Sequence, residues 1–98
     1  MSNFHELVDK NFESLDLYTG AITRAHGESH PEAFTVRELF IAIQTKVTGA
    51  SKDTPALDDE FTKLREVTDN YKIPSDVCET YAKVYEMLAE LDKAYQEK

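Results

Sequence analysis

The chain has 98 residues, enough for one domain with its own core and too few for two. Hydrophobic residues make up 41% and charged residues 31%, a balance that argues against intrinsic disorder. The net charge of −8 would repel phosphate backbones and anionic lipid, so we expect neither nucleic acid nor a membrane as partner. The sequence opens without an apolar signal segment and has no apolar run near the roughly 20 residues that span a bilayer. We therefore expect a cytoplasmic protein, and its one cysteine excludes an internal disulfide.

The first predicted helix runs from Asn3 to His26. Its apolar residues recur at steps of three and four, which places them on one face of a helix. They are Phe4, Leu7, Val8, Phe12, Leu15, Tyr18 and Ile22. Ser2 or Asn3 is the expected N-cap. Gly27 is the expected left-handed residue just beyond the last turn.

The second predicted helix begins in segment 28–32. Pro31 suits a first helical turn because its missing N–H would have no partner within the helix there. Gly49 is expected to close the helix. The apolar face consists of Val36, Leu39, Phe40, Ile43 and Val47.

The third predicted helix opens with Thr54-Pro55, a cap followed by a first-turn proline. Its apolar stripe is Leu57, Phe61, Leu64, Val67 and Tyr71. Segment 73–76 contains a proline, so it breaks this helix and caps a fourth one, which runs from about Asp76 to the end. The stripe of the fourth helix is Val77, Tyr81, Val84, Leu88, Leu91 and Tyr95.

Four helices joined by connections of a few residues must lie antiparallel to their neighbours, because a short loop cannot return the chain to its starting end. No stretch alternates polar and apolar residues with the period of a strand. The sequence therefore predicts an all-α protein, an antiparallel up-down-up-down four-helix bundle that forms a single domain over residues 1–98. The tyrosines are expected to pack in this bundle with their hydroxyl tips in water.

The candidate metal ligands are His5 and His26, two of the three histidines, and the third is His30. His5 and His26 are three heptads apart and point to the same side, but a straight helix separates them by about 30 Å. They cannot share one ion within a chain. Segment 26–32 has a competing interpretation as end-capping, with His26 at the last carbonyls of the first helix. The later helices contain no His-x-x-x-Glu pair, so a two-metal carboxylate site is not encoded in the usual way.

Cys78 falls near the start of the fourth helix, where the helix dipole can activate a thiol. It follows the apolar Val77 and has no basic neighbour in the sequence, so we interpret it as a packed small hydrophobe. The sequence contains no glycine-rich phosphate loop, serine elbow or Cys-x-x-Cys. General acid–base catalysis needs a perturbed titrating group in a cleft, and no residue is singled out for that role. We expect no enzymatic activity.

Two stretches resemble the hemerythrin-like domain of the iron–sulfur cluster repair di-iron proteins. Segment 24–32, RAHGESHPE, is similar to the family's VHG-x-x-HPEL turn. Segment 64–81, LREVTDNYKIPSDVCETY, resembles the family's LT-x-x-Y-x-P-P-x-x-AC-x-T-[YW] segment between its last two helices. Phe4-His5 also stands at the spacing of a Tyr-His pair that begins the family's first helix.

The resemblance implies a four-helix bundle that holds two irons and serves repair of clusters damaged by oxidative or nitrosative stress. Carried over by position, His5 matches a first-helix iron ligand and His26 matches the turn histidine. The other ligands do not carry over. Segment 45–50 replaces the family's His-Met-x-Lys-Glu-Glu, segment 54–57 replaces a ligand histidine, and the sequence ends at Lys98 before a His-x-x-x-Glu pair. We expect no metal cofactor in the monomer, with iron as the alternative.

Three functions stay open at this point. The first is a divergent relative that has kept the bundle and lost the metal, and that acts by contact with a protein partner or as a homodimer. The second is a metal-binding protein whose site is completed across a dimer by His5 or His26. The third is a small acidic immunity- or antitoxin-type helical protein, which fits the size and composition and rests on no motif.

Overall fold

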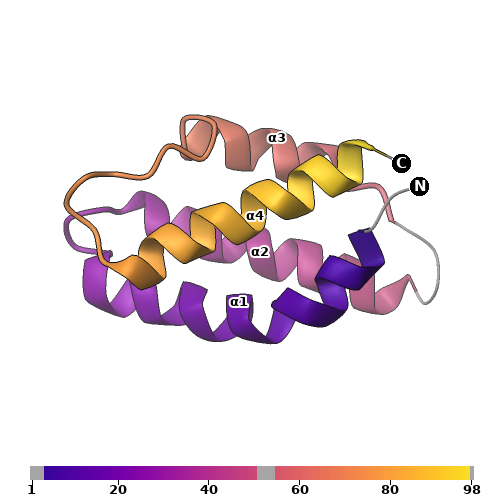
Figure 1. Cartoon of the computed structure of the whole chain (residues 1–98), viewed down its shortest axis with the longest axis horizontal. Helices are drawn as coiled ribbons and strands as arrows, with labels where there is room; N and C mark the ends of the chain where they lie inside the picture. The colour runs from indigo at the N-terminus through magenta and orange to yellow at the C-terminus, as the bar shows by residue number, and fades with distance from the viewer. Residues whose placement is uncertain (1–3, 51–54, 98) are drawn as a thin grey trace.

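The computed structural model describes residues 4–50 and 55–97, and these ranges contain four α-helices. They are α1 (Phe4–His26), α2 (Glu32–Gly49), α3 (Asp58–Val67) and α4 (Glu79–Gln96). α1 packs against both α2 and α4, and α2 also packs against α3. The α1–α2 and α3–α4 connections lie at one end of the molecule, and the start of α1 and the end of α4 lie at the other (Figure 1). The predicted all-α up-down-up-down bundle is confirmed.

The predicted apolar stripes of the four helices face a common interior. Residues from all four are completely or almost completely buried: Leu15 and Ile22, Phe40 and Ile43, Phe61 and Leu64, and Leu88 and Leu91. Removing apolar surface from water is the main favourable contribution to folding, at about 25 cal/mol per Å². The period of three and four residues thus identified this part of the core correctly.

Three tyrosines differ from the sequence-based expectation. Tyr81, Tyr85 and Tyr95 are buried, hydroxyl groups included, rather than tipped into water. The hydroxyls of Tyr81 and Tyr85 lie 3.2 Å apart and hydrogen-bond to each other. The Tyr95 hydroxyl accepts a hydrogen bond from the backbone N–H of Leu57 at 2.7 Å. These internal partners remove the cost of burying an unpaired phenol, which is why the bundle can enclose all three.

The end of α1 is built differently from the prediction. Gly27 does not adopt a positive φ, so the expected left-handed cap is wrong. The glycine is required for space instead, because a Cβ there would lie 2.4 Å from the carbonyl oxygen of Thr23 and 2.6 Å from the ring of Phe34. The proposed N-caps of α1, Ser2 and Asn3, lie outside the described residues.

α3 is shorter than predicted at both ends. It begins at Asp58, after Pro55, and the proposed cap Thr54 lies outside the described residues. It ends at Val67 rather than Tyr71. Residues 69–71 instead form a left-handed turn, with φ of 54°, 60° and 63°.

Backbone and side-chain hydrogen bonds close the end of α3 before Tyr71. The N–H of Asn70 donates to the carbonyl of Arg65 at 2.8 Å, and the N–H of Tyr71 donates to Oγ1 of Thr68 at 2.8 Å. Such bonds satisfy the last carbonyls of a helix, as a C-terminal cap does. The connection to α4 is therefore longer than segment 73–76, and the N-cap of α4 is Cys78 rather than a residue of that segment.

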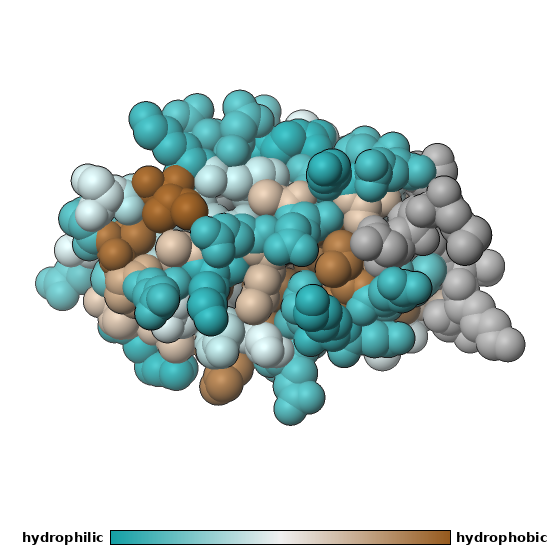
Figure 2. Space-filling view, viewed as in Figure 1, coloured by the Kyte–Doolittle hydropathy of each residue, from teal (hydrophilic) through white to brown (hydrophobic). Residues whose placement is uncertain are grey.

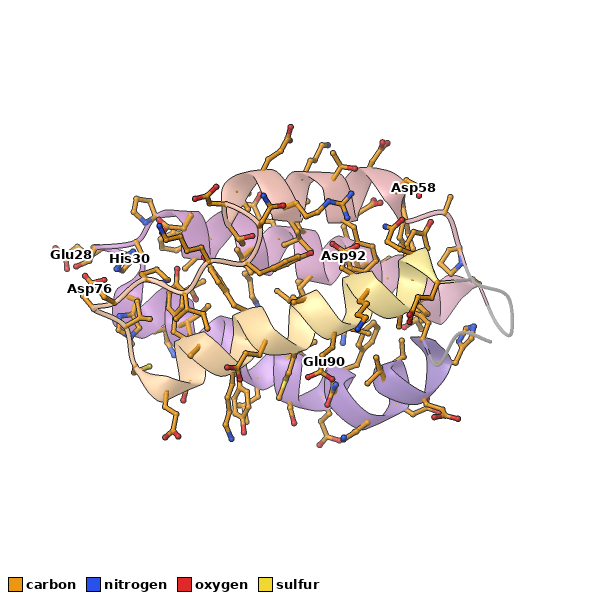
Figure 3. The ribbon with its side chains drawn as sticks, turned by 45° about the horizontal axis from the view of Figure 1, so that its top comes forward. Glu28, His30, Asp58, Asp76, Glu90 and Asp92 are labelled. Atoms are coloured by element: carbon orange, nitrogen blue, oxygen red, sulfur yellow. The ribbon has the colours of Figure 1, made fainter. Side chains whose placement is uncertain are left out.

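A buried carboxylate joins α3 to α4. Asp92 of α4 is only 4% exposed and lies between the two helices (Figure 3). It accepts hydrogen bonds from Nη1 of Arg65 at 2.7 and 2.8 Å and from the hydroxyl of Tyr71 at 2.8 Å. Gln96 donates a further bond at 3.1 Å. A carboxylate supplied with this many donors tolerates removal from water.

Candidate functional site

The two residues predicted as metal ligands lie at opposite ends of α1. His5 is in the first turn and His26 is the last residue of one continuous helix of 23 residues. Such a helix is about 34 Å long, close to the 37 Å length of the whole molecule. The two histidines are therefore not brought together within the chain, and whether either one binds a metal stays a prediction.

His26 instead meets the cysteine. Its Nε2 lies 3.2 Å from Sγ of Cys78, although the two residues are 52 positions apart in the sequence. Cys78 is exposed, so its interpretation as a packed hydrophobe is wrong. The reason is the late start of α4, which leaves Cys78 ahead of the first turn and off the buried stripe. The imidazole contacts this thiol rather than the last carbonyls of α1.

His30 bridges the start of α2 and the α3–α4 connection. Its Nδ1 lies 3.1 Å from Oε2 of Glu32, and its Nε2 lies 3.0 Å from Oδ1 of Asp76. Figure 3 shows His30 and Asp76 side by side at this end of the molecule. The hydrogen bond to Glu32, with a further contribution from Asp76, raises the pKa of His30 above its ordinary value, and desolvation only partly opposes this.

His26 and His30 both pack against the ring of Tyr81. The ring centroids of His26 and His30 are 5.4 and 5.7 Å from that of Tyr81, both in edge-to-face geometry. Burial is the main cause that raises the pKa of the Tyr81 phenol far above its ordinary value, so the Tyr81 side chain stays neutral. We call the group His26, His30, Asp76, Cys78 and Tyr81 the His–Cys end.

The residues present do not fit a di-iron centre. Within residues 4–50 and 55–97, no three His, Cys, Asp or Glu side chains converge in a way that could hold a metal ion. Both ring nitrogens of His30 already face carboxylates. The interior between the helices, where irons would have to lie, is filled by apolar and aromatic side chains such as Leu15, Phe40 and Tyr85.

Exposed apolar side chains occur in the same part of the molecule. Phe34, 52% exposed, packs its ring over Gly27 in the α1–α2 turn. Ile73, 40% exposed, belongs to the α3–α4 connection. Figure 2 shows hydrophobic surface over that connection at this end, among mostly hydrophilic surroundings. Exposed apolar side chains therefore lie at the same end of the molecule as the His–Cys end.

The predicted topology, rather than any local sequence pattern, could have indicated where the His–Cys end forms. In an up-down-up-down bundle the first and third connections lie at the same end, because each pair of helices reverses the chain direction. Segments 24–32 and 64–81 contain these two connections, so the predicted topology alone brings them together. Predicting that His26 contacts Cys78 would also have required the path of the α3–α4 connection.

Comparisons with protein-family models, with curated proteins and with solved structures found no match to this chain. The fold defines the class of protein, an all-α protein of four compactly packed helices. None of the described helices is both long enough and apolar enough to cross a membrane.

Proposed function

We propose that this chain is a divergent, ligand-depleted relative of the hemerythrin-like domain found in iron–sulfur cluster repair proteins, and that it acts in the oxidative or nitrosative stress response through protein–protein contact rather than catalysis. One observation carries the proposal. The two stretches that resemble this family, 24–32 and 64–81, pack directly against each other, through His26 with Cys78 and through His30 with Asp76.

The His–Cys end, together with the exposed apolar residues Phe34 and Ile73, has the composition of a contact surface. Protein interfaces combine an apolar centre with a polar rim and a few hydrogen-bonding anchors. Phe34 and Ile73 supply exposed apolar area, and Cys78 and Asp76 supply exposed polar groups. A patch of this kind supports a transient contact with a partner rather than a large permanent interface.

Metal content tests the ligand-depleted part of the proposal. We expect protein purified without a tag or chelator to contain far less than one iron per chain by elemental analysis, because no three ligands converge. Two irons per chain would contradict the proposal and would mean that the bundle rearranges around the metal.

Affinity capture tests the contact surface. The wild-type chain and the double variant Phe34→Ser, Ile73→Ser would be used as baits in extracts of nitrosatively stressed cells. Leu17→Ser is the matched control, because Leu17 is also an exposed apolar residue, 65% exposed, but lies in the middle of α1. We expect proteins retained by the wild type and by Leu17→Ser to be lost with the double variant. Equal retention by all three baits would refute a contact at this end.

A second candidate function is a metal site completed across a dimer. It is favoured by the exposed thiol of Cys78 and the half-buried imidazole of His26 at 3.2 Å, a ready pair of ligands. Two copies would supply two sulfur and two nitrogen ligands, a set that suits tetrahedral zinc or iron. This function predicts half a metal per chain and a dimer in gel filtration, both lost in Cys78→Ser. A monomer without metal would exclude it.

A further inference from the structure

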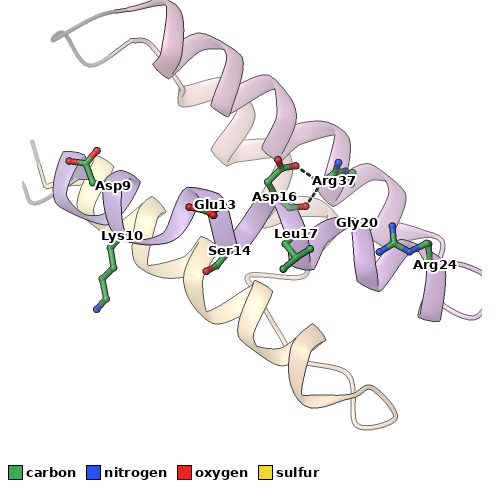
Figure 4. Close-up of a pocket in the computed structure, with 9 residues that line it drawn as sticks. All are labelled: Asp9, Lys10, Glu13, Ser14, Asp16, Leu17, Gly20, Arg24 and Arg37. Carbon is green, nitrogen blue, oxygen red and sulfur yellow. Dashed lines mark hydrogen bonds and ion pairs between the residues drawn. The ribbon is translucent and has the colours of Figure 1, made fainter.

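A groove of about 570 Å³ runs along α1 and is lined by none of the residues that define the His–Cys end. It is lined by eight residues of α1 and by Arg37 of α2 (Figure 4). Its acidic residues Asp9 and Glu13 lie toward the start of α1, while Arg24 lies toward the end of that helix. With Lys10 beside Asp9, and Asp16 beside Arg37, the start of the groove has a net charge of −1 and the part near Gly20 a net charge of +1.

Two guanidinium groups converge over Gly20. Nη1 of Arg24 lies 3.5 Å, and Nη1 of Arg37 3.6 Å, from the position that a Cβ of residue 20 would occupy. Because glycine has no side chain, the space between the two groups is open. Figure 4 shows Arg24 reaching back along α1 toward Gly20, as a side chain four residues later on a helix does.

Arg37 is held rigidly in this position. Its Nη1 donates to Oδ1 of Asp16 at 3.0 Å and to Oγ1 of Thr19 at 2.8 Å, and also to the carbonyl oxygen of Asp16. All of these bonds use Nη1, which is also the Arg37 nitrogen nearest the Cβ position of residue 20, so Arg37 contributes a fixed positive charge there, while Nη2 and Nε keep their N–H groups. A donor that is fixed in advance loses little conformational entropy when it binds a ligand.

Arg24 is not engaged within the described part of the chain. Its guanidinium makes no hydrogen bond or ion pair with any residue in 4–50 or 55–97, and the residue is exposed. The chain has only three arginines, and the third, Arg65, is bound to Asp92. In a protein of net charge −8, the unengaged guanidinium of Arg24 and the fixed guanidinium of Arg37 thus both lie within 4 Å of the Cβ position of one glycine.

We infer that the notch over Gly20, between Arg24 and Arg37, binds a small oxyanion, a phosphoryl or carboxylate group. Guanidinium groups bind both through paired, charge-assisted N–H···O bonds. Asp16 neutralises part of the charge of Arg37, so the notch keeps a net positive charge near one. The acidic residues further along the groove repel an extended polyanion, which restricts the site to a compact anion.

Titration of the full chain with inorganic phosphate, followed by amide and arginine side-chain NMR, tests the site. Sodium chloride would keep the ionic strength constant. We expect saturable shifts confined to residues 19–21 and to the Nε–H signals of Arg24 and Arg37. A parallel titration with acetate distinguishes a phosphoryl from a carboxylate preference, and saturation by either anion supports the site. The absence of saturable, localised shifts with both anions would overturn the inference.

Three variants distinguish anion binding at the notch from non-specific electrostatic attraction to the groove. Arg24→Gln should weaken anion binding about tenfold or more, since it removes one charged hydrogen-bonding partner. Lys10→Gln is the matched control, because it removes the same charge from the same groove at a distance from Gly20, and we expect its binding to stay within about twofold. Gly20→Ala should also weaken binding, because its Cβ fills the floor of the notch at ordinary contact distances that the fold tolerates. Equal losses in Lys10→Gln and Arg24→Gln, or unchanged binding in Arg24→Gln, would overturn the inference.

Discussion

At the scale of single residues, His30 makes the stability of the protein depend on pH. Glu32 and Asp76 face its two ring nitrogens and raise its pKa above the ordinary 6.5. A pKa raised in the folded state means that the imidazolium stabilises the fold fully below pH 6.5, and that this contribution is lost as the pH rises through the raised value. We expect His30→Asn to lower the Tm more at about pH 6 than at about pH 9. Equal losses at the two pH values would show that the ion pairs do not stabilise the fold.

Gly27 and Gly49 offer a matched pair of substitutions. Gly27→Ala places a Cβ 2.4 Å from a backbone oxygen and against the Phe34 ring, so we expect a loss of about 1–3 kcal/mol. Gly49 has no atom within 4 Å of such a Cβ and lies in a helix, so Gly49→Ala should gain about 0.5–1 kcal/mol. Urea unfolding measures both changes. A neutral Gly27→Ala would mean that the end of α1 relaxes freely.

At the scale of elements, the left-handed turn after α3 depends on Tyr71. Three consecutive residues other than glycine with positive φ are strained, at about 1 kcal/mol each or more. The hydroxyl of Tyr71 is anchored to Asp92 at 2.8 Å, and burial beside this carboxylate raises the pKa of the phenol far above its ordinary value, so it remains a donor. Tyr71→Phe should therefore cost about 1.5–3 kcal/mol in urea unfolding.

Tyr18→Phe is the control for this substitution. Tyr18 is also partly buried, but its hydroxyl makes no hydrogen bond with the residues that the structure describes. We expect its loss to stay near zero. Equal stability of the two variants would mean that other contacts hold the turn.

The helices themselves were largely predictable, and their ends were not. The stripe of α4 at Val84, Leu88 and Leu91 follows from helical periodicity, which is a local property. Local hydrogen bonds close the end of α3, and the contact of Tyr71 with Asp92, 21 residues away, adds an anchor that no local pattern contains. The apolar spacing from Val67 to Tyr71 favoured continuing the helix, whereas the intervening residues 68–70 (Thr, Asp, Asn) are weak helix formers, and the hydrogen bonds of the turn end the helix there.

At the scale of the whole molecule, Asp92 holds α3 on the bundle. Asp92→Ala would leave the phenol of Tyr71 and the guanidinium of Arg65 without their acceptor. We expect a loss of about 3 kcal/mol, at the lower end for a broken buried pair because the side chain of Arg65 is 35% exposed. This is a large fraction of the roughly 5–15 kcal/mol that stabilises a small domain.

Hydrogen exchange locates this effect. The amides of α3 should lose protection in Asp92→Ala before those of α1 and α2, because Asp92 bonds to Arg65 of α3 and only the ring contact of Phe61 with Tyr95 and similar apolar packing would then join α3 to α4. Glu90→Ala, an exposed substitution on the same helix, is the control and should leave the exchange pattern unchanged. Uniform loss of protection in all four helices would show that the bundle unfolds as one unit.

The sequence by itself determined that four amphipathic helices fold into an antiparallel bundle, because helical periodicity and short connections are local constraints. It also determined that His5 and His26 cannot meet, since helix geometry fixes their separation. Only the tertiary structure decided that Cys78 meets His26, that Asp92 is buried, and that two arginines converge over Gly20. Each of these arrangements joins residues from separate segments of the chain, and the packing of whole helices, rather than any local preference, sets the distances between them.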